Sequence, residues 1–252
     1  MPRFGHRVDK TNPIMRGCVG WWPLNDGAGS KAVDLSGNGN DAVVTTGLPT
    51  WGTTEKGVAL SGGNPLEAPA FPVTNVDAFS IVAWIDSNGS NGNWLGSWSS
   101  EQPINAVLIR KNLLEALVRN AANTSDDTIA LSTSLSSIGT GLVQVALVVD
   151  SGNAKLYANG ELNQEDASFM AGPYISASAT EFGFGNARVT SFPAGSNIQN
   201  VRVYDRALSA TEVSRLYTEP WAGLEPLSPF SFFSGLSQIY AYYSAAFLQR
   251  LG

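Results

Sequence analysis

The sequence predicts an all-β protein, an antiparallel jelly-roll β-sandwich with one short C-terminal helix and an apolar C-terminal tail. Glycine, serine, threonine and asparagine are abundant, whereas charged residues make up only 14% of the 252 residues. This composition is typical of strands joined by many turns. Apolar residues recur mostly with period two, in short blocks bounded by Gly, Asn, Pro and Ser, the pattern of half-buried strands. The hydrophobic content of 43% is enough for a sizeable core.

The strands are predicted from these blocks in chain order. The block 142–150 is apolar on both of its faces, so we expect a central strand that is covered on both sides. Asn159-Gly160 predicts a type I′ hairpin turn, because both central residues of that turn need a positive φ. The predicted strands are "CVGWWPL" (18–24), "AFSIVAWI" (78–85), "INAVLIRK" (104–111), "EALVRN" (115–120), "TIALST" (128–133), "LVQVALVVD" (142–150), "AKLYANGEL" (154–162, a hairpin), "TEFGFGN" (180–186) and "NIQNVRVYD" (197–205).

One helix is predicted after the last strand, in "ALSATEVSRLY" (207–217). Ser209 and Glu212 have the spacing of a capping box, in which each side chain binds the other residue's backbone N–H. Leu208 and Val213 occupy the positions of a hydrophobic staple. The Glu219-Pro220 pair is expected to end the helix, since a residue before proline disfavours the helical conformation.

After Trp221 the sequence becomes an apolar, aromatic segment with only two charged residues, Glu225 and Arg250. We therefore divide the chain into an N-terminal arm (1–15), a jelly-roll domain (16–218) and an apolar docking or oligomerisation segment (219–252). Two alternatives stay open for that segment: packing on its own sandwich, or docking onto a partner subunit or a larger assembly. The predicted assembly interface consists of Trp221, Phe230, Phe232, Phe233, Tyr240, Tyr243 and Phe247.

Charge and rare residues exclude several function classes. The net charge is −6 and no lysine or arginine run occurs, so nucleic acid and anionic membranes are poor partner candidates. No run of about 18 apolar residues is present, so membrane insertion is not expected. Cys18 is the single cysteine and His6 the single histidine. An intrachain disulfide, a histidine-rich zinc site and a catalytic triad not built on His6 are therefore excluded.

The stretch "SGNGNDAVV" (36–44) predicts either a tight turn or a cation site. Asp34, Asn38, Asn40 and Asp41 offer the oxygen ligands that calcium prefers. In the alternative, Asp34 and Asn38 form Asx-turns while Gly37 and Gly39 adopt left-handed conformations. The residues favour the turn.

Three motifs in the chain resemble those of a known family. The segment 17–44, "GCVGWWPLNDGAGSKAVDLSGNGNDAVV", resembles the opening of laminin-G-like, concanavalin A-like jelly-roll domains. "VQVALVVDSGNAKLYANGEL" (143–162) is similar to the family's paired strands, and "NVRVYDRALSATEVSRLY" (200–217) to its final strand and helix. The resemblance covers about residues 16 to 218 and implies the sandwich fold. It says little about function, because this fold serves lectins, glucanases, adhesion modules and virion proteins.

The resemblance also implies a location for calcium. Many relatives pair the loop with an acidic residue just before the final strand, where this chain has Gln199 and Asn200. Gln199 thus completes a candidate calcium set with Asp34, Asn38, Asn40 and Asp41. Replacing acids by amides weakens such a site. If EDTA leaves the melting temperature unchanged and added calcium does not raise it, no structural calcium exists.

Catalysis is not expected, and glycan binding has one candidate region. Glucanases of this fold place carboxylates on one strand in an E-x-D-x-x-E pattern, which does not occur here. No phosphate-loop or dinucleotide fingerprint occurs either. In "NGSNGNWLGSWSSEQ" (88–102), Trp94 and Trp98 beside Asn91 and Asn93 are candidate glycan contacts. The alternative, which the residue type favours, is that both tryptophans belong to the core.

A second resemblance concerns the setting. "LYTEPWAGLEP" (216–226) and "NPIMRGCVGWWPLNDGAG" (12–29) look like segments of virion proteins from tailed bacteriophages and prophages. This implies a non-enzymatic virion structural protein: a capsid decoration, head-fibre or tail-associated subunit, assembled in the host cytoplasm. The implied partners are other virion proteins, further copies of the chain and a host-surface glycan. The first residues, "MPRFGHRVDKTNP", lack the apolar core of a signal peptide. The alternative function is a free carbohydrate-binding module.

Overall fold

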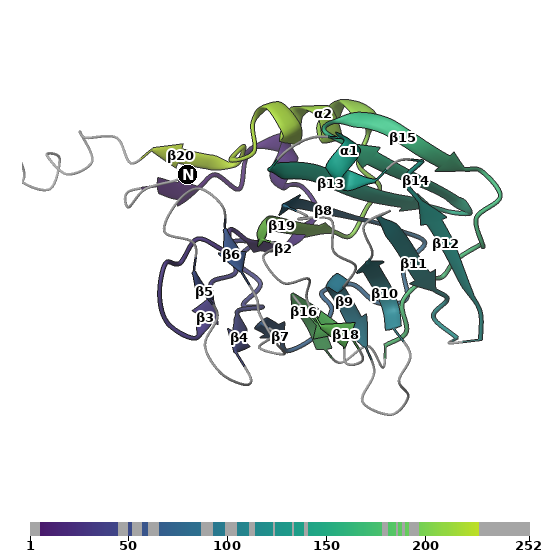
Figure 1. The fold of residues 1–252 in the computed structure, drawn as a ribbon, viewed down its shortest axis with the longest axis horizontal. Coiled ribbons are helices and arrows are strands. Elements are labelled where there is room, and N and C mark those ends of the chain that lie inside the picture. The colour runs from purple at the N-terminus through teal and green to yellow at the C-terminus, as the bar shows by residue number, and fades with distance from the viewer. Residues whose placement is uncertain are drawn as a thin grey trace, which may run out of the picture.

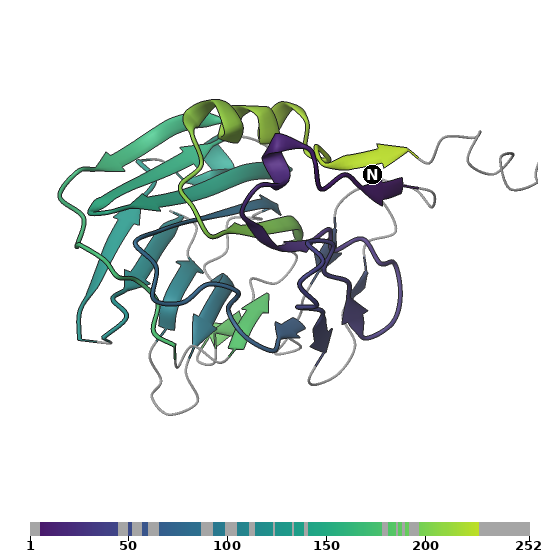
Figure 2. The same ribbon diagram turned by 180° about the vertical axis from the view of Figure 1, so that it is seen from behind.

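Two antiparallel β-sheets lie face to face in this protein, as Figure 1 and Figure 2 show from opposite sides. The fold is that of a computed structural model, which describes residues 6–44, 50–51, 57–59, 66–86, 93–98, 105–110, 114–122, 124–132, 134–138, 141–177, 181–184, 186–187, 190–191 and 197–226. Within these residues each main sheet has eight strands. The predicted all-β sandwich is confirmed.

The first sheet, named sheet I, carries the main helix on its outer face (Figure 1). Its strand order is β15-β14-β13-β8-β19-β6-β5, and β2 also pairs with β19. The strands of sheet I are β2 (Cys18–Trp22), β5 (Thr50–Trp51), β6 (Val58–Ala59), β8 (Ala78–Asp86), β13 (Leu142–Asp150), β14 (Asn153–Ala158), β15 (Glu161–Asp166) and β19 (Asn197–Tyr204).

The second sheet, named sheet II, has the order β12-β11-β10-β9-β16-β7-β4-β3. Its strands are β3 (Lys31–Ala32), β4 (Ala42–Val44), β7 (Leu66–Ala68), β9 (Asn93–Trp98), β10 (Asn105–Arg110), β11 (Glu115–Arg119), β12 (Asp126–Ala130) and β16 (Glu181–Phe184). Outside the two sheets are the ribbon of β1 (His6–Val8) with β20 (Leu224–Pro226), the pair β17 (Asn186–Ala187) and β18 (Thr190–Ser191), the 3-10 helix η1 (Pro13–Met15), and the helices α1 (Leu135–Ile138) and α2 (Ala210–Thr218).

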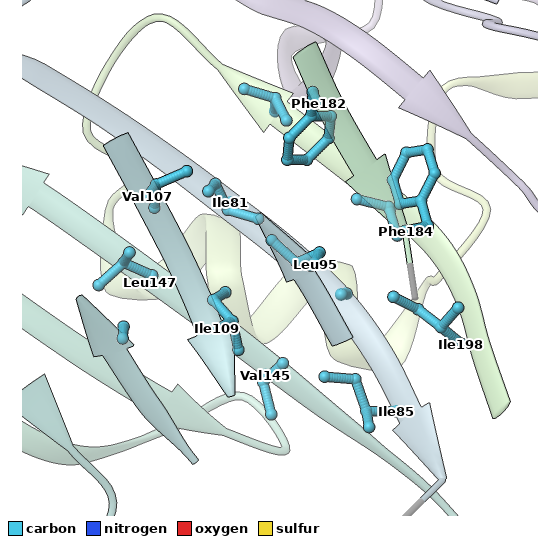
Figure 3. Packing of buried hydrophobic residues seen from close by; sticks show 14 of the residues in the cluster. Ile81, Ile85, Leu95, Val107, Ile109, Val145, Leu147, Phe182, Phe184 and Ile198 are labelled. Carbon is cyan, nitrogen blue, oxygen red and sulfur yellow. The ribbon is translucent and has the colours of Figure 1, made fainter. Parts of the chain in front are cut away.

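The main core fills the space between the sheets. Figure 3 shows side chains of β8, β13 and β19 from sheet I meeting those of β9, β10 and β16 from sheet II. Trp22 contributes aromatic contacts, with ring centroids 5.5 Å from Phe182 and 5.1 Å from Phe184. Burying such a large apolar surface is the main stabilising contribution to a sandwich fold.

Every block predicted as a strand falls on an observed strand, and β13 is the clearest case. Val145 and Leu147 lie in the main core, while Ala146 and Val148 lie in a second cluster on the outer face of sheet I. The expectation of a strand covered on both sides is therefore confirmed. The hairpin from β14 to β15 is confirmed as well, because Asn159 (φ 51°) and Gly160 (φ 81°) both adopt a positive φ.

Helix α2 lies on the outer face of sheet I (Figure 2), where it packs beside β15 and accepts a hydrogen bond from Gln144 of β13 at Val213 O. Its N-cap is Ser209, and the predicted capping box with Glu212 is present. The staple residues Leu208 and Val213 are buried in the second cluster. The helix ends at Thr218, as predicted from the Glu219-Pro220 pair. Among the residues that the structure describes, no helix has the length and apolarity needed to span a membrane.

The segment after α2 is fixed to the outer face of sheet I by Arg202, which is fully buried. Its guanidinium donates to the backbone carbonyls of Pro220 (2.7 Å) and Ala222 (2.9 Å). It also lies 3.8 Å from the ring centroid of Trp21, a cation–π contact. Asn200 accepts from the indole N–H of Trp21 and donates to Pro220 O. We name this group of contacts, together with the β1–β20 ribbon, the C-terminal latch.

Candidate functional site

The loop that follows β3 is organised by the Asp34 carboxylate, which is only 7% exposed. Its two oxygens accept four hydrogen bonds: from the backbone N–H of Trp21 (2.9 Å), Ser36 (2.8 Å) and Asn40 (3.0 Å), and from the Ser36 hydroxyl (2.8 Å). The bond from Ser36 N–H is the Asx-turn predicted at Asp34. The loop is thereby tied to β2, the first strand of the core.

The remaining polar side chains of the loop also make turn contacts. The side-chain amides of Asn38 (3.0 Å) and Asn40 (3.1 Å) both donate to the Val19 carbonyl. Gly37 (φ 88°) and Gly39 (φ 77°) adopt the predicted left-handed conformation. The Asx-turn expected at Asn38 is wrong, because the N–H of Asn40 that it requires donates to Asp34 instead.

This donor pattern fits a turn better than a cation cage. Calcium requires oxygens with free lone pairs facing one point, whereas the oxygens of Asp34 and Val19 O already accept from N–H or O–H groups. Lys31 forms an ion pair with Asp41, whose Oδ1 also accepts from Asp34 N–H.

Gln199, the candidate ligand outside the loop, is buried in β19, and its Oε1 has no hydrogen-bond partner in the described part of the chain. Within that same part, no group of three His, Cys, Asp or Glu residues has a metal-binding arrangement. The turn is the interpretation that the sequence favours, and the EDTA experiment tests it against calcium binding.

The predicted glycan contacts are placed only at the level of the backbone. β9, which contains Asn93, Trp94 and Trp98, lies inside sheet II between β10 and β16. Asn91 and the side chains of these three residues fall outside the described part of the chain. The neighbouring Leu95 is buried in the main core.

The predicted assembly interface is described at one residue. Trp221 is half-buried and packs against the second cluster of its own sandwich, held by the C-terminal latch. The other predicted interface residues, Phe230, Phe232, Phe233, Tyr240, Tyr243 and Phe247, lie outside the described residues.

The structure reveals a further candidate site that the sequence analysis missed. A cleft of about 240 Å³ lies on the outer face of sheet I, where the cover provided by α2 ends. Its floor is formed by outward-facing residues of β13 and β14, and one wall by residues 207–210. The Ser80 hydroxyl fixes that wall, since it donates to Arg206 O (2.9 Å) and accepts from Leu208 N–H (3.0 Å).

The cleft combines an apolar floor with polar groups at its rim. Val148 and Tyr157 belong to the buried second cluster, whereas Asp150, Asn153 and Lys155 carry the polar groups. The Glu165 carboxylate on β15 accepts from Asn153 Nδ2 (2.9 Å) and pairs with Lys155 Nζ (3.3 Å). These two contacts fix the side chains of Asn153 and Lys155 at the rim.

Tyr157 is the least exposed polar side chain of the cleft, at 3%. Its hydroxyl has no hydrogen-bond partner among the described residues, although the side chain lines the cleft. Burial raises the pKa of this phenol, and Glu165 raises it further while Lys155 lowers it. The hydroxyl therefore stays protonated at neutral pH and is able to donate a hydrogen bond.

Comparisons with known proteins agree with this fold. A family model described as the concanavalin A-like lectin/glucanases superfamily matches residues 60–214. The matched part includes β13, β14, β15 and the 207–210 wall of the cleft. No protein of curated function matches the sequence.

Several solved structures share the architecture. The receptor-binding domain of botulinum neurotoxin D aligns with a TM-score of 0.62 at 16% identity, over 82% of this chain and 54% of that one. The serotype D ligand-binding domain in complex with N-acetylneuraminic acid gives 0.60 and 16%, over 80% and 50%. A type C neurotoxin, described as requiring two ganglioside molecules to enter cells, gives 0.61 and 17%, over 82% and 52%. The chain thus spans about half the length of these neurotoxin chains, and at such identities the likeness shows the fold alone.

Proposed function

The chain belongs to the concanavalin A-like lectin/glucanases superfamily, and from that membership we propose that it is a non-enzymatic, lectin-like module that binds carbohydrate. The family match over residues 60–214 carries the proposal. Neurotoxin domains of the same fold, one of them bound to N-acetylneuraminic acid, are consistent with it. Because only about half of each neurotoxin chain is aligned, their ligands are not assigned to this protein.

One pair of carboxylates, Asp26 and Asp41, is better suited to a structural role than to catalysis. Glycosidases use two carboxylates, one with a raised pKa as the acid and a second that is free to act as base or nucleophile. Burial raises the pKa of Asp26, and nearby Asp41 raises it further. Asp41, however, is engaged by Lys31, the main cause of its lowered pKa, and by the N–H of Asp34. This pair therefore has no free second carboxylate.

The finer proposal is that the module is a structural subunit of a tailed-bacteriophage particle, assembled in the host cytoplasm with other virion proteins and further copies of itself. The two stretches that resemble virion proteins form one unit in the structure. Just before the first stretch, Asp9 N–H donates to Gly223 O (2.8 Å), and β1 pairs with β20. Ile14, Met15 and Ala222 share the second cluster. Together these contacts hold residues 219–226 on the sandwich.

A glycan array probed with the full-length protein tests the carbohydrate proposal. We expect retention on at least one class of glycan. Absence of binding to every glycan would contradict it. The virion proposal is tested separately by asking whether the protein copurifies with particles and where antibodies against it label them; a protein confined to the soluble fraction would contradict that role.

A further inference from the structure

We propose that the cleft between the β13–β14 hairpin and residues 207–210 is a sugar-binding site for a single uncharged hexose ring. The inference rests on the proposed carbohydrate-binding function and assigns it a location and a ligand class. The cleft is on sheet I, whereas the region indicated by the sequence, around Trp94, is on sheet II. Substitutions in the cleft and a substitution of Trp94 therefore test the two locations separately.

The size of the cleft limits the ligand to about one ring. Its volume of about 240 Å³ lies below the range of roughly 300–1,000 Å³ that is usual for drug-sized ligands. The wall at 207–210 is held at both ends by hydrogen bonds, from Ser80 and from the capping box of α2. A pre-formed wall reduces the ordering cost of binding.

The hydrogen-bonding groups suit a ligand that carries several hydroxyls. Tyr157 lines the cleft together with the apolar side chains of Val148 and Leu208, and its hydroxyl is available to a ligand. The Asp150 carboxylate makes no hydrogen bond or ion pair among the described residues and can accept from hydroxyl groups. Asn153 donates to Glu165 through Nδ2, which leaves its Oδ1 as a second acceptor. A buried aromatic floor with a few convergent polar groups is the usual composition of a small-molecule pocket.

The charges of the cleft favour an uncharged sugar over an acidic one. Asp150 lines the cleft, and Glu165 contacts both Asn153 and Lys155 at its rim. Lys155 is the single cation among the lining residues, and it is already paired with Glu165. The carboxylates of Asp150 and Glu165 outnumber the single ammonium of Lys155. The cleft therefore repels the carboxylate of a sialic or uronic acid.

The test is a titration of the full-length protein, followed by NMR, with methyl hexosides (mannoside, galactoside and glucoside) and, separately, with N-acetylneuraminic acid. We expect at least one neutral hexoside to perturb the protein, with the acidic sugar at least fivefold weaker. Tyr157→Phe removes only an unpartnered hydroxyl, so the variant should keep the wild-type melting temperature and bind the hexoside about five- to tenfold more weakly. Asp150→Asn should also weaken binding. Tyr217→Phe, which makes the same change on the exposed face of α2, should bind as the wild type does.

The outcomes separate this inference from the function on which it rests. If the wild type binds glycans on the array and Tyr157→Phe and Asp150→Asn bind equally well, the cleft assignment is wrong and the function stands. Loss of binding in Trp94→Ala alone, at an unchanged melting temperature, would place the site on sheet II and overturn the assignment. If no glycan binds the wild type, the function and the cleft assignment fail together.

Discussion

At the residue scale, Asp34 is the side chain that holds the loop after β3 (residues 34–41) in its folded conformation. Its carboxylate accepts four hydrogen bonds in a nearly buried position. Asp34→Ala leaves these donors without their partner, and we expect the free energy of unfolding to fall by about 2–4 kcal/mol. Asn38→Ala, in the same loop but exposed, should lower it by less than about 1 kcal/mol. Urea denaturation measures both, and equal losses would contradict this role for Asp34.

The hydrogen bonds of the same loop lead to a prediction about calcium. Because the oxygens of Asp34 and Val19 accept from protein donors, we expect EDTA to leave the melting temperature unchanged, and we expect added calcium not to raise it. Calorimetric melting in each condition is the measurement. A rise with calcium that disappears in Asp41→Asn would show an occupied site and refute this expectation.

At the residue scale, the sequence could predict local contacts but not those made across the fold. The Asx-turn at Asp34 follows from its spacing to Ser36, and the left-handed glycines follow from residue type. The bond from Trp21 N–H to Asp34 and the bond from Arg202 to Pro220 O join residues 13 and 18 positions apart, in different elements of the fold. Arg202 looks like an ordinary outward-facing residue in a strand pattern, and only the folded segment 219–226 explains its burial.

At the scale of elements, the N-terminus of α2 depends on the ionisation of Glu212. Its carboxylate accepts from Arg206 and from Ser209 N–H, and the bond from Arg206 is the main reason that its pKa is lowered from 4.5 to about 2. A lowered pKa in the folded state means that the contribution is complete above pH 4.5 and is lost as the pH falls toward 2. Glu212→Gln keeps a capping side chain but no charge. It should therefore be less stable than the wild type at pH 6, and the difference should shrink by pH 2.5.

Urea unfolding of both proteins at the two pH values measures this prediction. A difference that is the same at pH 6 and pH 2.5 would show that the Arg206–Glu212 pair does not contribute to the acid sensitivity of the fold.

Elements with strong periodicity or caps were predictable, and short ones were not. β8, β13 and α2 carry long apolar patterns or a capping box. Strands of two or three residues, such as β3 and β20, are too short to show a period. Their pairing partners, not their own residues, make them strands.

At the scale of the whole molecule, the C-terminal latch sets the point at which the sandwich can be truncated. A chain ending at residue 218 would lose the carbonyls that hold the buried Arg202, as well as the β20 strand. We expect it to be less stable by on the order of 3–5 kcal/mol, because the Arg202 guanidinium loses both of its carbonyl acceptors. A chain ending at residue 226 keeps these contacts and should melt like the full-length protein. If the proposed assembly role of Phe230 to Phe247 is right, this chain should fold but not join particles.

Circular dichroism melting of the two truncated chains, and copurification of the longer one with particles, are the measurements. Equal stability of both chains would refute the latch. Recovery of the 1–226 chain on particles at the wild-type level would refute the assembly role of the segment that follows.

The overall fold was predictable because alternation, turns and three motifs all indicate the same sandwich. The cleft was not, since it arises only where residues 207–210 fold back over β13 and β14. Asp150, Asn153, Lys155 and Tyr157 alternate along the hairpin as the outward face of any strand pair would. Nothing in that alternation indicates a wall above them.

The most direct test of the central claim, binding of carbohydrate without cleavage, is equilibrium retention of an oligosaccharide by the full-length protein, with the oligosaccharide then analysed by mass spectrometry. The account predicts that an array-positive oligosaccharide is retained and recovered at its original length after prolonged incubation. Failure to retain any oligosaccharide, or recovery of shortened products, would contradict it.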